Sequence, residues 1–293
     1  MTITRLEAVD PVALADVKGA TTVAVCLPAH DEAATIGQIV DAIRAELVVA
    51  TPLVDQIVVL DDASGDATAQ VAEEAGATVL ASAEVLPAAG IRRGKGEAMW
   101  KSVAAIDADV IAWIDADLVD FDTGFVTRLV EPLLDDPHCV FAKGHYARPV
   151  GADGLPGGRV TELVARPALS LYHPELTVFP QPLSGEIAAR RSALSGLPFA
   201  SGYGVDVALL IDTVARYGLD RVASVDLGVR VHRNRPLDQL APQAFEVLHA
   251  ILARAAVELP ERPRLVDADG DPVATNVEER PALDSLPREW FAA

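Results

Sequence analysis

The sequence is poor in cysteine and has no long apolar run. Among its 293 residues there are two cysteines, Cys26 and Cys139, which are far apart in the chain. We expect both to be buried free thiols in a reducing, cytoplasmic setting. No run of about 18 apolar residues is present, so we expect no transmembrane helix. The N-terminus lacks a basic stretch followed by an apolar core, so we expect neither a signal peptide nor a membrane partner.

Positive charge is also scarce. The 24 Lys and Arg residues face 43 Asp and Glu residues, which gives a formal net charge of −19. This excess argues against nucleic acid or an anionic membrane surface as the main partner. Two cationic clusters stand out, namely Arg92, Arg93, Lys95 and Lys101, and then Arg230, His232, Arg233 and Arg235. On so acidic a chain they indicate sites for a small anionic substrate, and solvated surface charges are the alternative.

Hydrophobic residues make up 51% of the chain, which is typical of a globular protein. In the first half, short apolar runs alternate with segments in which apolar residues recur at helical spacing. We expect strands at 22–27, 56–60, 78–81 and 110–114, and helices at 33–47, 67–75 and 95–105. Strands that alternate with helices predict an α/β fold with a doubly wound, mostly parallel, Rossmann-like sheet.

The pattern after residue 120 is less regular. It predicts helices at 125–134, 205–217 and 241–259, and strands at 140–146 and 223–231. The tail is rich in Pro, Asp, Glu and Arg, a composition typical of mobile segments. We therefore divide the chain into a lead-in (1–20), a regular half (21–120), a second half of the same domain (121–259) and a mobile tail (260–293).

The acidic pair Asp115-Ala116-Asp117 is the most informative motif. It directly follows the apolar run 110–114, which predicts a buried central strand. Ligands bind at the carboxyl ends of such strands in open α/β sheets. Carboxylates are suitable ligands for Mg²⁺ or Mn²⁺ held against a nucleotide diphosphate. The alternative is that one of the two only caps the next helix.

Glycines flank Lys95 in the motif Gly94-Lys95-Gly96. Glycines allow a close approach of the backbone to an anion, and the following helix offers free N–H groups. The motif is not a Walker A loop, because Gly96 stands where Ser or Thr is required. No G-x-G-x-x-G follows a strand either, which weakens a dinucleotide interpretation.

Three further segments offer candidate ligands. His232 lies among arginines at a predicted strand end, where it could bind a metal or be structural. The run Gly158-Arg159-Val160-Thr161 could cradle an anion or be a plain surface loop. Asp206 begins a predicted helix, where a carboxylate also stabilises the positive end.

Together these motifs resemble a known family. Residues 28–32 (Pro-Ala-His-Asp-Glu), the Asp61-Asp62 turn and the acidic pair look like a GT-A nucleotide-sugar glycosyltransferase. The motifs at 94–100, 158–167, 181–186, 202–205 and 232–236 are similar to those of the actinobacterial glucosyl-3-phosphoglycerate synthases. The resemblance extends from about Val23 to Leu252.

The resemblance implies an activity, a fold and partners. These enzymes have the GT-A fold, with a nucleotide-sugar-binding half (21–120) and an acceptor-binding half (121–259). They transfer glucose from UDP-glucose to the 2-hydroxyl of 3-phosphoglycerate with retention at the anomeric carbon. The resemblance also implies a metal cofactor, Mg²⁺ or Mn²⁺, a homodimer, and a place in glucosylglycerate or methylglucose polysaccharide synthesis.

The resemblance assigns roles to individual residues. The uridine nucleotide would be lined by Pro28, Ala29, His30, Glu32, Asp62 and Lys95. The metal on the diphosphate would be held by Asp117 and His232, with Asp115 and Ala116 nearby. The acceptor would bind at Gly158, Arg159 and Thr161. The residues at the reacting centre would be Asp206, Arg230 and Leu183, with Asp206 on the glucose hydroxyls and Arg230 by the phosphates.

Other activities remain open at this point. The family usually has Leu at position 30, Ser at 62 and Glu at 206, whereas this chain has His30, Asp62 and Asp206. These differences leave room for a mannosyl-3-phosphoglycerate synthase that uses GDP-mannose. A non-catalytic nucleotide-sugar sensor is disfavoured, because both acidic residues and His232 are present. A sugar-1-phosphate nucleotidyltransferase is disfavoured, because its glycine-rich signature after the first strand is absent.

Overall fold

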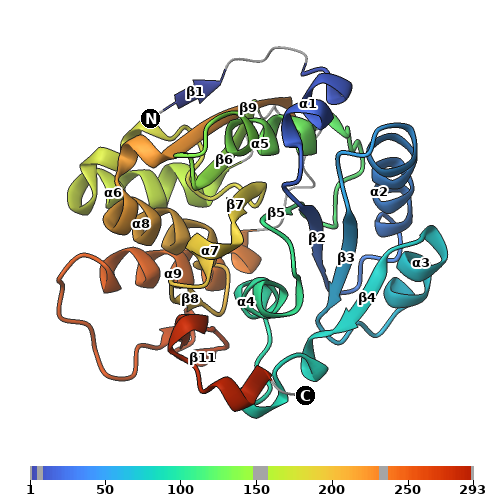
Figure 1. Cartoon of the computed structure of the whole chain (residues 1–293). Coiled ribbons are helices and arrows are strands. Elements are labelled where there is room, and N and C mark those ends of the chain that lie inside the picture. Colours follow the sequence, from blue (N-terminus) through green and yellow to red (C-terminus); the bar gives the residue numbers. More distant parts are fainter. Residues whose placement is uncertain (1, 5–8, 148–157, 231–236, 292–293) are drawn as a thin grey trace.

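A mixed eight-stranded sheet forms the centre of the molecule (Figure 1). The computed structural model describes residues 2–4, 9–147, 158–230 and 237–291. Within them the strand order is β1-β9-β6-β7-β5-β2-β3-β4. The strands are β1 (Thr2–Thr4), β2 (Val23–Ala29), β3 (Gln56–Asp61), β4 (Thr78–Ala81), β5 (Val110–Trp113), β6 (Phe141–Ala147), β7 (Ile187–Arg190) and β9 (Val222–Val229).

Most neighbouring strands run parallel, as predicted. Strand β2 pairs in parallel with both β3 and β5, and β3 pairs in parallel with β4. Strand β7 was not predicted, and it runs antiparallel to both β5 and β6. Strand β1 was part of the patternless lead-in, and it pairs with β9 at the edge of the sheet. The central strand β2 is buried from Val23 to Leu27, which explains its continuous apolar run.

Helices cover both faces of the sheet. One apolar core holds residues of α1 (Pro11–Lys18), α2 (Ile36–Ile43), α3 (Thr68–Ala75) and α5 (Gly124–Asp135). The other holds residues of α4 (Lys95–Ala105), α6 (Arg166–Tyr172), α7 (Arg191–Leu194), α8 (Val205–Tyr217) and α9 (Leu237–Ala253). This is the three-layer arrangement expected of alternating strands and helices.

Several boundaries differ from the predictions. The helix predicted at 33–47 consists of α2 followed by a π-helical segment, Arg44–Ala50, which keeps Leu47 buried. The helix predicted at 241–259 begins at Leu237 and ends at Ala253. A second π-helical segment, Thr161–Ala165, leads into α6. Short 3-10 turns complete the connections, at Ser82–Glu84, Pro87–Ala89, Pro174–Val178, Leu219–Arg221, Leu283–Ser285 and Arg288–Phe291.

Part of the predicted mobile tail packs against the body of the protein. Strand β12 (Glu279–Arg280) pairs antiparallel with β8 (Phe199–Ala200). The side chain of Leu283 is buried, and the backbone oxygen of Pro281 accepts a hydrogen bond from Trp100 Nε1 at 2.9 Å. A two-stranded hairpin, β10 (Leu265–Val266) and β11 (Pro272–Val273), precedes this contact. The polar composition of the tail did not indicate these contacts, because the partner of Arg280 is a buried glutamate far away in the sequence, Glu97.

Two smaller predictions can be compared with the fold. Cys26 and Cys139 are both free and buried, as expected. In the parts of the chain that the structure describes, no helix combines the length and apolar character needed to cross a bilayer.

Candidate active site

A cavity of about 550 Å³ opens at the carboxyl ends of the parallel strands. It is lined by every predicted site residue that the structure describes, drawn from both halves of the chain. They are Pro28, Ala29, His30, Glu32, Asp62, Lys95, Asp115, Ala116, Asp117, Gly158, Arg159, Thr161, Leu183, Asp206 and Arg230. His232, the second predicted metal ligand, lies outside the described residues.

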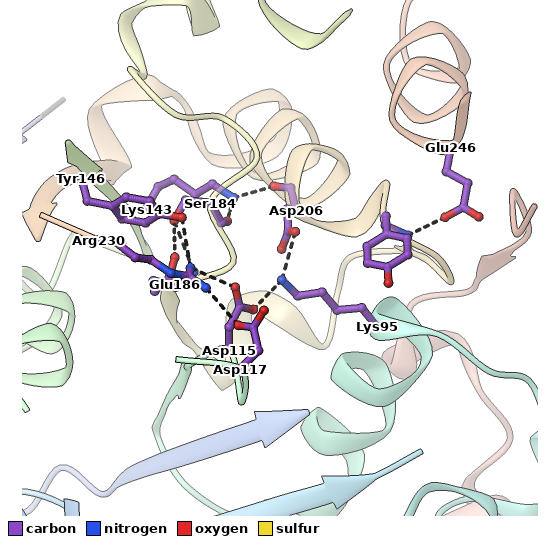
Figure 2. Close-up of polar contacts among 11 residues, drawn as sticks. Lys95, Asp115, Asp117, Lys143, Tyr146, Ser184, Glu186, Asp206, Arg230 and Glu246 are labelled. Carbon is purple, nitrogen blue, oxygen red and sulfur yellow. Dashed lines mark hydrogen bonds and ion pairs between the residues drawn. The ribbon is translucent and has the colours of Figure 1, made fainter. Parts of the chain in front are cut away.

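Lys95 contacts one carboxylate from each half of the chain. It is the first residue of α4, and its ammonium lies 2.9 Å from Asp115 Oδ1 and 3.1 Å from Asp206 Oδ2 (Figure 2). Gly185 permits this arrangement, because a Cβ at that position would lie 2.3 Å from Asp115 Oδ1 and from Lys95 Nζ. A side chain at position 185 would therefore break the contact between Lys95 and Asp115.

Arg230 holds the acidic pair from the opposite side. Its Nη1 lies 3.2 Å from Asp115 Oδ2, and its Nη2 lies 3.0 Å from Asp117 Oδ1 (Figure 2). Burial by itself would raise the pKa of Asp115, but the charges of Lys95 and Arg230 outweigh it and hold that pKa well below its usual range. Asp115 is therefore a carboxylate at all ordinary pH values.

Buried residues also hold Arg230 in place. Glu186 is fully buried and forms an ion pair with Arg230, and Ser184 Oγ donates to Glu186 Oε2 at 2.8 Å. The guanidinium also donates to Tyr146 Oη at 3.1 Å and lies 5.3 Å from the centre of that ring. These contacts fix the plane of Arg230, so that it presents a preset cationic surface.

Lys143 is a second buried cation that the sequence analysis did not single out. Its Nζ donates to the backbone oxygens of Ser184 at 2.7 Å and Asp206 at 2.9 Å. It thereby ties the loop that follows Leu183 to the first turn of α8. Burial lowers the pKa of Lys143 to about 8. A lysine in the middle of a mostly apolar predicted strand was the available signal, since such residues are rarely buried without a function or partner.

Two residues that line the cavity have buried polar atoms without partners. Among the described residues, Asp206 Oδ1 and Arg230 Nε are buried and have no hydrogen-bond partner. Burial raises the pKa of Asp206 despite the opposing charges of Lys95 and Lys143. Since buried polar atoms are normally hydrogen-bonded, the orphaned Asp206 oxygen is suited to a ligand hydroxyl.

The other end of the cavity is built around Asp62. Its Oδ2 accepts a hydrogen bond from the backbone N–H of Gly94 at 2.7 Å, and its backbone oxygen lies 2.9 Å from His30 Nδ1. Burial raises the pKa of the Asp62 carboxyl, and the Gly94 bond opposes this rise. The Asp61-Asp62 turn is thus linked directly to the glycine turn that carries Lys95.

The carboxylates can be compared with the needs of a divalent cation. In the described parts of the chain, no group of three or more His, Cys, Asp or Glu side chains is arranged around a metal position. Asp117 fits as a ligand, because its half-exposed side chain lines the cavity and offers hard oxygen atoms. The role of Asp115 differs, since one of its oxygens contacts Lys95 and the other contacts Arg230.

Comparisons with known proteins identify the family of the chain. A model of glycosyl transferase family 2 matches residues 24–182. The glucosyl-3-phosphoglycerate synthase of Mycolicibacterium smegmatis is 46% identical over 244 residues, which are 82% of this chain and 80% of that protein. The corresponding protein of Petrotoga mobilis is 44% identical over 236 residues, which are 79% of this chain and 73% of that protein.

Solved structures of this family have the same fold. The crystal structure of glucosyl-3-phosphoglycerate synthase from Mycobacterium tuberculosis in complex with Mn²⁺, UDP-glucose and phosphoglyceric acid is similar with a TM-score of 0.88. It is 41% identical, and the match covers 97% of this chain and 98% of that one. The predicted α/β GT-A fold and the predicted family are confirmed. The chain is a family 2 glycosyltransferase and belongs to the glucosyl-3-phosphoglycerate synthase family.

Proposed function

We propose that this enzyme transfers glucose from UDP-glucose to the 2-hydroxyl of 3-phosphoglycerate, with retention at the anomeric carbon and with the help of a divalent metal. The observation that supports this most strongly is the joint lining of one cavity by Lys95, the acidic pair, Asp206, Arg159 and Arg230. The names and bound molecules of the relatives supply the donor and the acceptor.

The donor would lie along the edge formed by β2, β3 and β5. Pro28, Ala29, His30, Glu32 and Asp62 would line the uridine part of the donor. Lys95 and Arg230 would face the diphosphate, whose leaving group gains negative charge as the sugar departs. Preset cations at that point lower the energy of the developing anion.

The metal would add to this stabilisation. Asp117 would hold it together with His232, and Asp115 would keep Lys95 and Arg230 in place beside it. Mg²⁺ and Mn²⁺ both accept carboxylate ligands and phosphate oxygens. When bound, the ion supplies Lewis-acid stabilisation of the diphosphate, and the relative's structure contains Mn²⁺.

The sugar would lie against Asp206. Its unpaired Oδ1 would accept a hydrogen bond from a glucose hydroxyl, while Oδ2 keeps its ion pair with Lys95. Leu183 would lie at the reacting centre, on the loop that Lys143 holds. We favour a front-face displacement in one ion-pair-like step, and trapping of a glycosyl adduct on Asp206 would overturn that view.

The acceptor would bind near the start of the π-helical segment. Gly158, Arg159 and Thr161 line the cavity there, and Thr161 is buried. A guanidinium and a hydroxyl suit a carboxylate or a phosphate. The resemblance to the family also supports a homodimer and a cytoplasmic location.

A side-by-side donor assay tests the proposal. The enzyme is incubated with 3-phosphoglycerate and UDP-glucose, GDP-glucose or GDP-mannose, each with and without Mg²⁺ or Mn²⁺. We expect metal-dependent product with UDP-glucose. Product with GDP-mannose alone would contradict UDP-glucose as the donor but not the location of the site. His30, Asp62 and Asp206 would then be the residues to examine.

A further inference from the structure

The C-terminal segment 276–281 lies beside the turn that carries Lys95, more than 180 residues earlier in the chain (Figure 1). We propose that this segment is a brace for the donor site, in which Arg280 and Asn276 act as positioning residues for the start of α4. The inference rests on the proposed function in one respect, namely that Lys95 acts on the donor's diphosphate.

The anchor of the brace is a buried ion pair. Arg280 is buried, and its Nε and Nη2 lie 2.6 Å and 2.7 Å from the two carboxylate oxygens of Glu97. Glu97 is fully buried in the first turn of α4, two residues after Lys95. The same guanidinium donates to Ala89 O at 2.6 Å and to Gly90 O at 3.2 Å. One side chain of the tail therefore binds both α4 and the loop before it.

The backbone of the tail adds a second set of contacts through β8. Ser201 N donates to Glu278 O at 2.8 Å, and Ser201 O accepts from Glu97 N at 3.0 Å. The backbones of α4 and β8 are in close contact here, because a Cβ at Gly96 would lie 1.8 Å from the oxygen of Ala200. Displacement of the tail would therefore be transmitted to the first turn of α4.

The third set of contacts forms part of the cavity wall. Asn276 lines the cavity, and its Nδ2 donates to Arg93 O at 2.7 Å. Glu246 joins the tail to the opposite wall, because its two oxygens accept from Asn276 N at 2.6 Å and from Tyr203 N at 2.7 Å. Hydrogen bonds of this one segment of the tail thus connect the loop 93–95, the loop 201–204 and helix α9.

These contacts matter for Lys95 because its ammonium must reach two carboxylates at once. Asp115 follows β5 and Asp206 lies in the first turn of α8, and each lies about as close to Nζ as a charge-assisted bond requires. A displacement of about 1 Å, even one caused far from the chemistry, costs on the order of 100-fold in rate. Rigid support of the α4 start is therefore a requirement of the site.

The test uses full-length variants of the tail. Arg280→Met removes the anchor but leaves Glu97 with Lys101, whose Nζ lies 3.5 Å away. Arg280→Lys keeps the charge without the two-pronged bond, and Asn276→Ala removes only the contact to Arg93. Arg288→Met is the matched control, since Arg288 is an exposed residue of the same tail.

Two readouts are needed, one of which does not depend on the donor. Hydrogen–deuterium exchange of peptides that cover 92–100 reports on the α4 start, at a temperature where circular dichroism shows each variant folded. Steady-state kinetics with UDP-glucose report on the site. For Arg280→Met we expect faster exchange in 92–100 and a fall of about 10- to 100-fold in kcat/KM for the donor. We expect smaller effects in Arg280→Lys and Asn276→Ala and none in Arg288→Met.

The outcomes separate this inference from the proposed function. Unchanged exchange in 92–100 in both Arg280→Met and Asn276→Ala would overturn the brace, whatever the donor is. Faster exchange with unchanged kcat/KM would also overturn it, because the contact would then be structural only. Failure of the wild-type enzyme to use UDP-glucose would instead contradict the proposed function, and the exchange experiment would still decide on the brace.

Discussion

Replacement of Asp206 by alanine tests the sugar site most sharply. The side chain is 8% exposed, and its Oδ1 has no partner among the described residues, so we assign that oxygen to a glucose hydroxyl. A hydrogen bond to a charged group contributes about 1.5–3 kcal/mol. Since about 1.4 kcal/mol corresponds to a factor of ten, Asp206→Ala should lower kcat/KM for UDP-glucose by about 10- to 150-fold. Asp206→Asn keeps an oxygen without the charge and should give a smaller loss.

The affinity for UDP, measured by calorimetric titration, separates the sugar contact from the contact with Lys95. UDP lacks the glucose of the donor, so its dissociation constant should change little in Asp206→Ala. A weakening of UDP binding equal to the loss in kcat/KM would refute the reasoning, because Asp206 would then act only by holding Lys95. Asp212→Asn is the matched control, since Asp212 is a partly buried carboxylate of the same helix, paired with Arg254 at 2.7 Å. We expect this variant to keep its kinetic constants.

Three further predictions concern the metal, the acceptor and a buried cation. Asp117→Ala should abolish turnover but leave the circular dichroism spectrum unchanged. Near-normal activity at saturating metal would contradict a metal-binding role. Arg159→Ala should raise the KM for 3-phosphoglycerate much more than that for UDP-glucose, and equal effects would remove Arg159 from the acceptor site. Lys143 has a pKa of about 8 against an ordinary 10.5, so its buried charge costs stability below pH 8 and this cost is relieved as the pH rises toward 10.5. Relative to Lys143→Met, the wild type should therefore gain about 3 kcal/mol of unfolding free energy between these pH values. A difference in unfolding free energy between the wild type and Lys143→Met that stays constant over this pH range, as measured by urea unfolding, would contradict the lowered pKa of Lys143.

The part of the site that lies at strand ends could be predicted from the sequence. Asp115 and Asp117 follow an apolar run that can only be a buried strand, and parallel strands place their carboxyl ends at one edge. The glycines around Lys95 mark a close approach of the backbone. The structure places all three side chains in one cavity, as these local patterns indicate.

The part that depends on distant pairing could not be predicted. Strand β7 (Ile-Ala-Ala-Arg) has no run of large apolar residues, and its antiparallel position between β5 and β6 is set by pairing across the sheet. The partner of Glu97 is Arg280, 183 residues away. No local spacing indicates such a contact, and the polar composition around Arg280 suggested a mobile tail instead.

The most direct test of the central claim is one NMR experiment on the reaction itself. The purified enzyme is mixed with UDP-glucose, 3-phosphoglycerate and Mn²⁺ or Mg²⁺, the metal is then removed, and the anomeric proton and phosphorus signals of the product are recorded. We predict UDP and one new glucoside that still carries a phosphate, has the anomeric configuration of the donor and does not form when a chelator is present from the start. An inverted glucoside, or hydrolysis of UDP-glucose with 3-phosphoglycerate unchanged, would contradict the account.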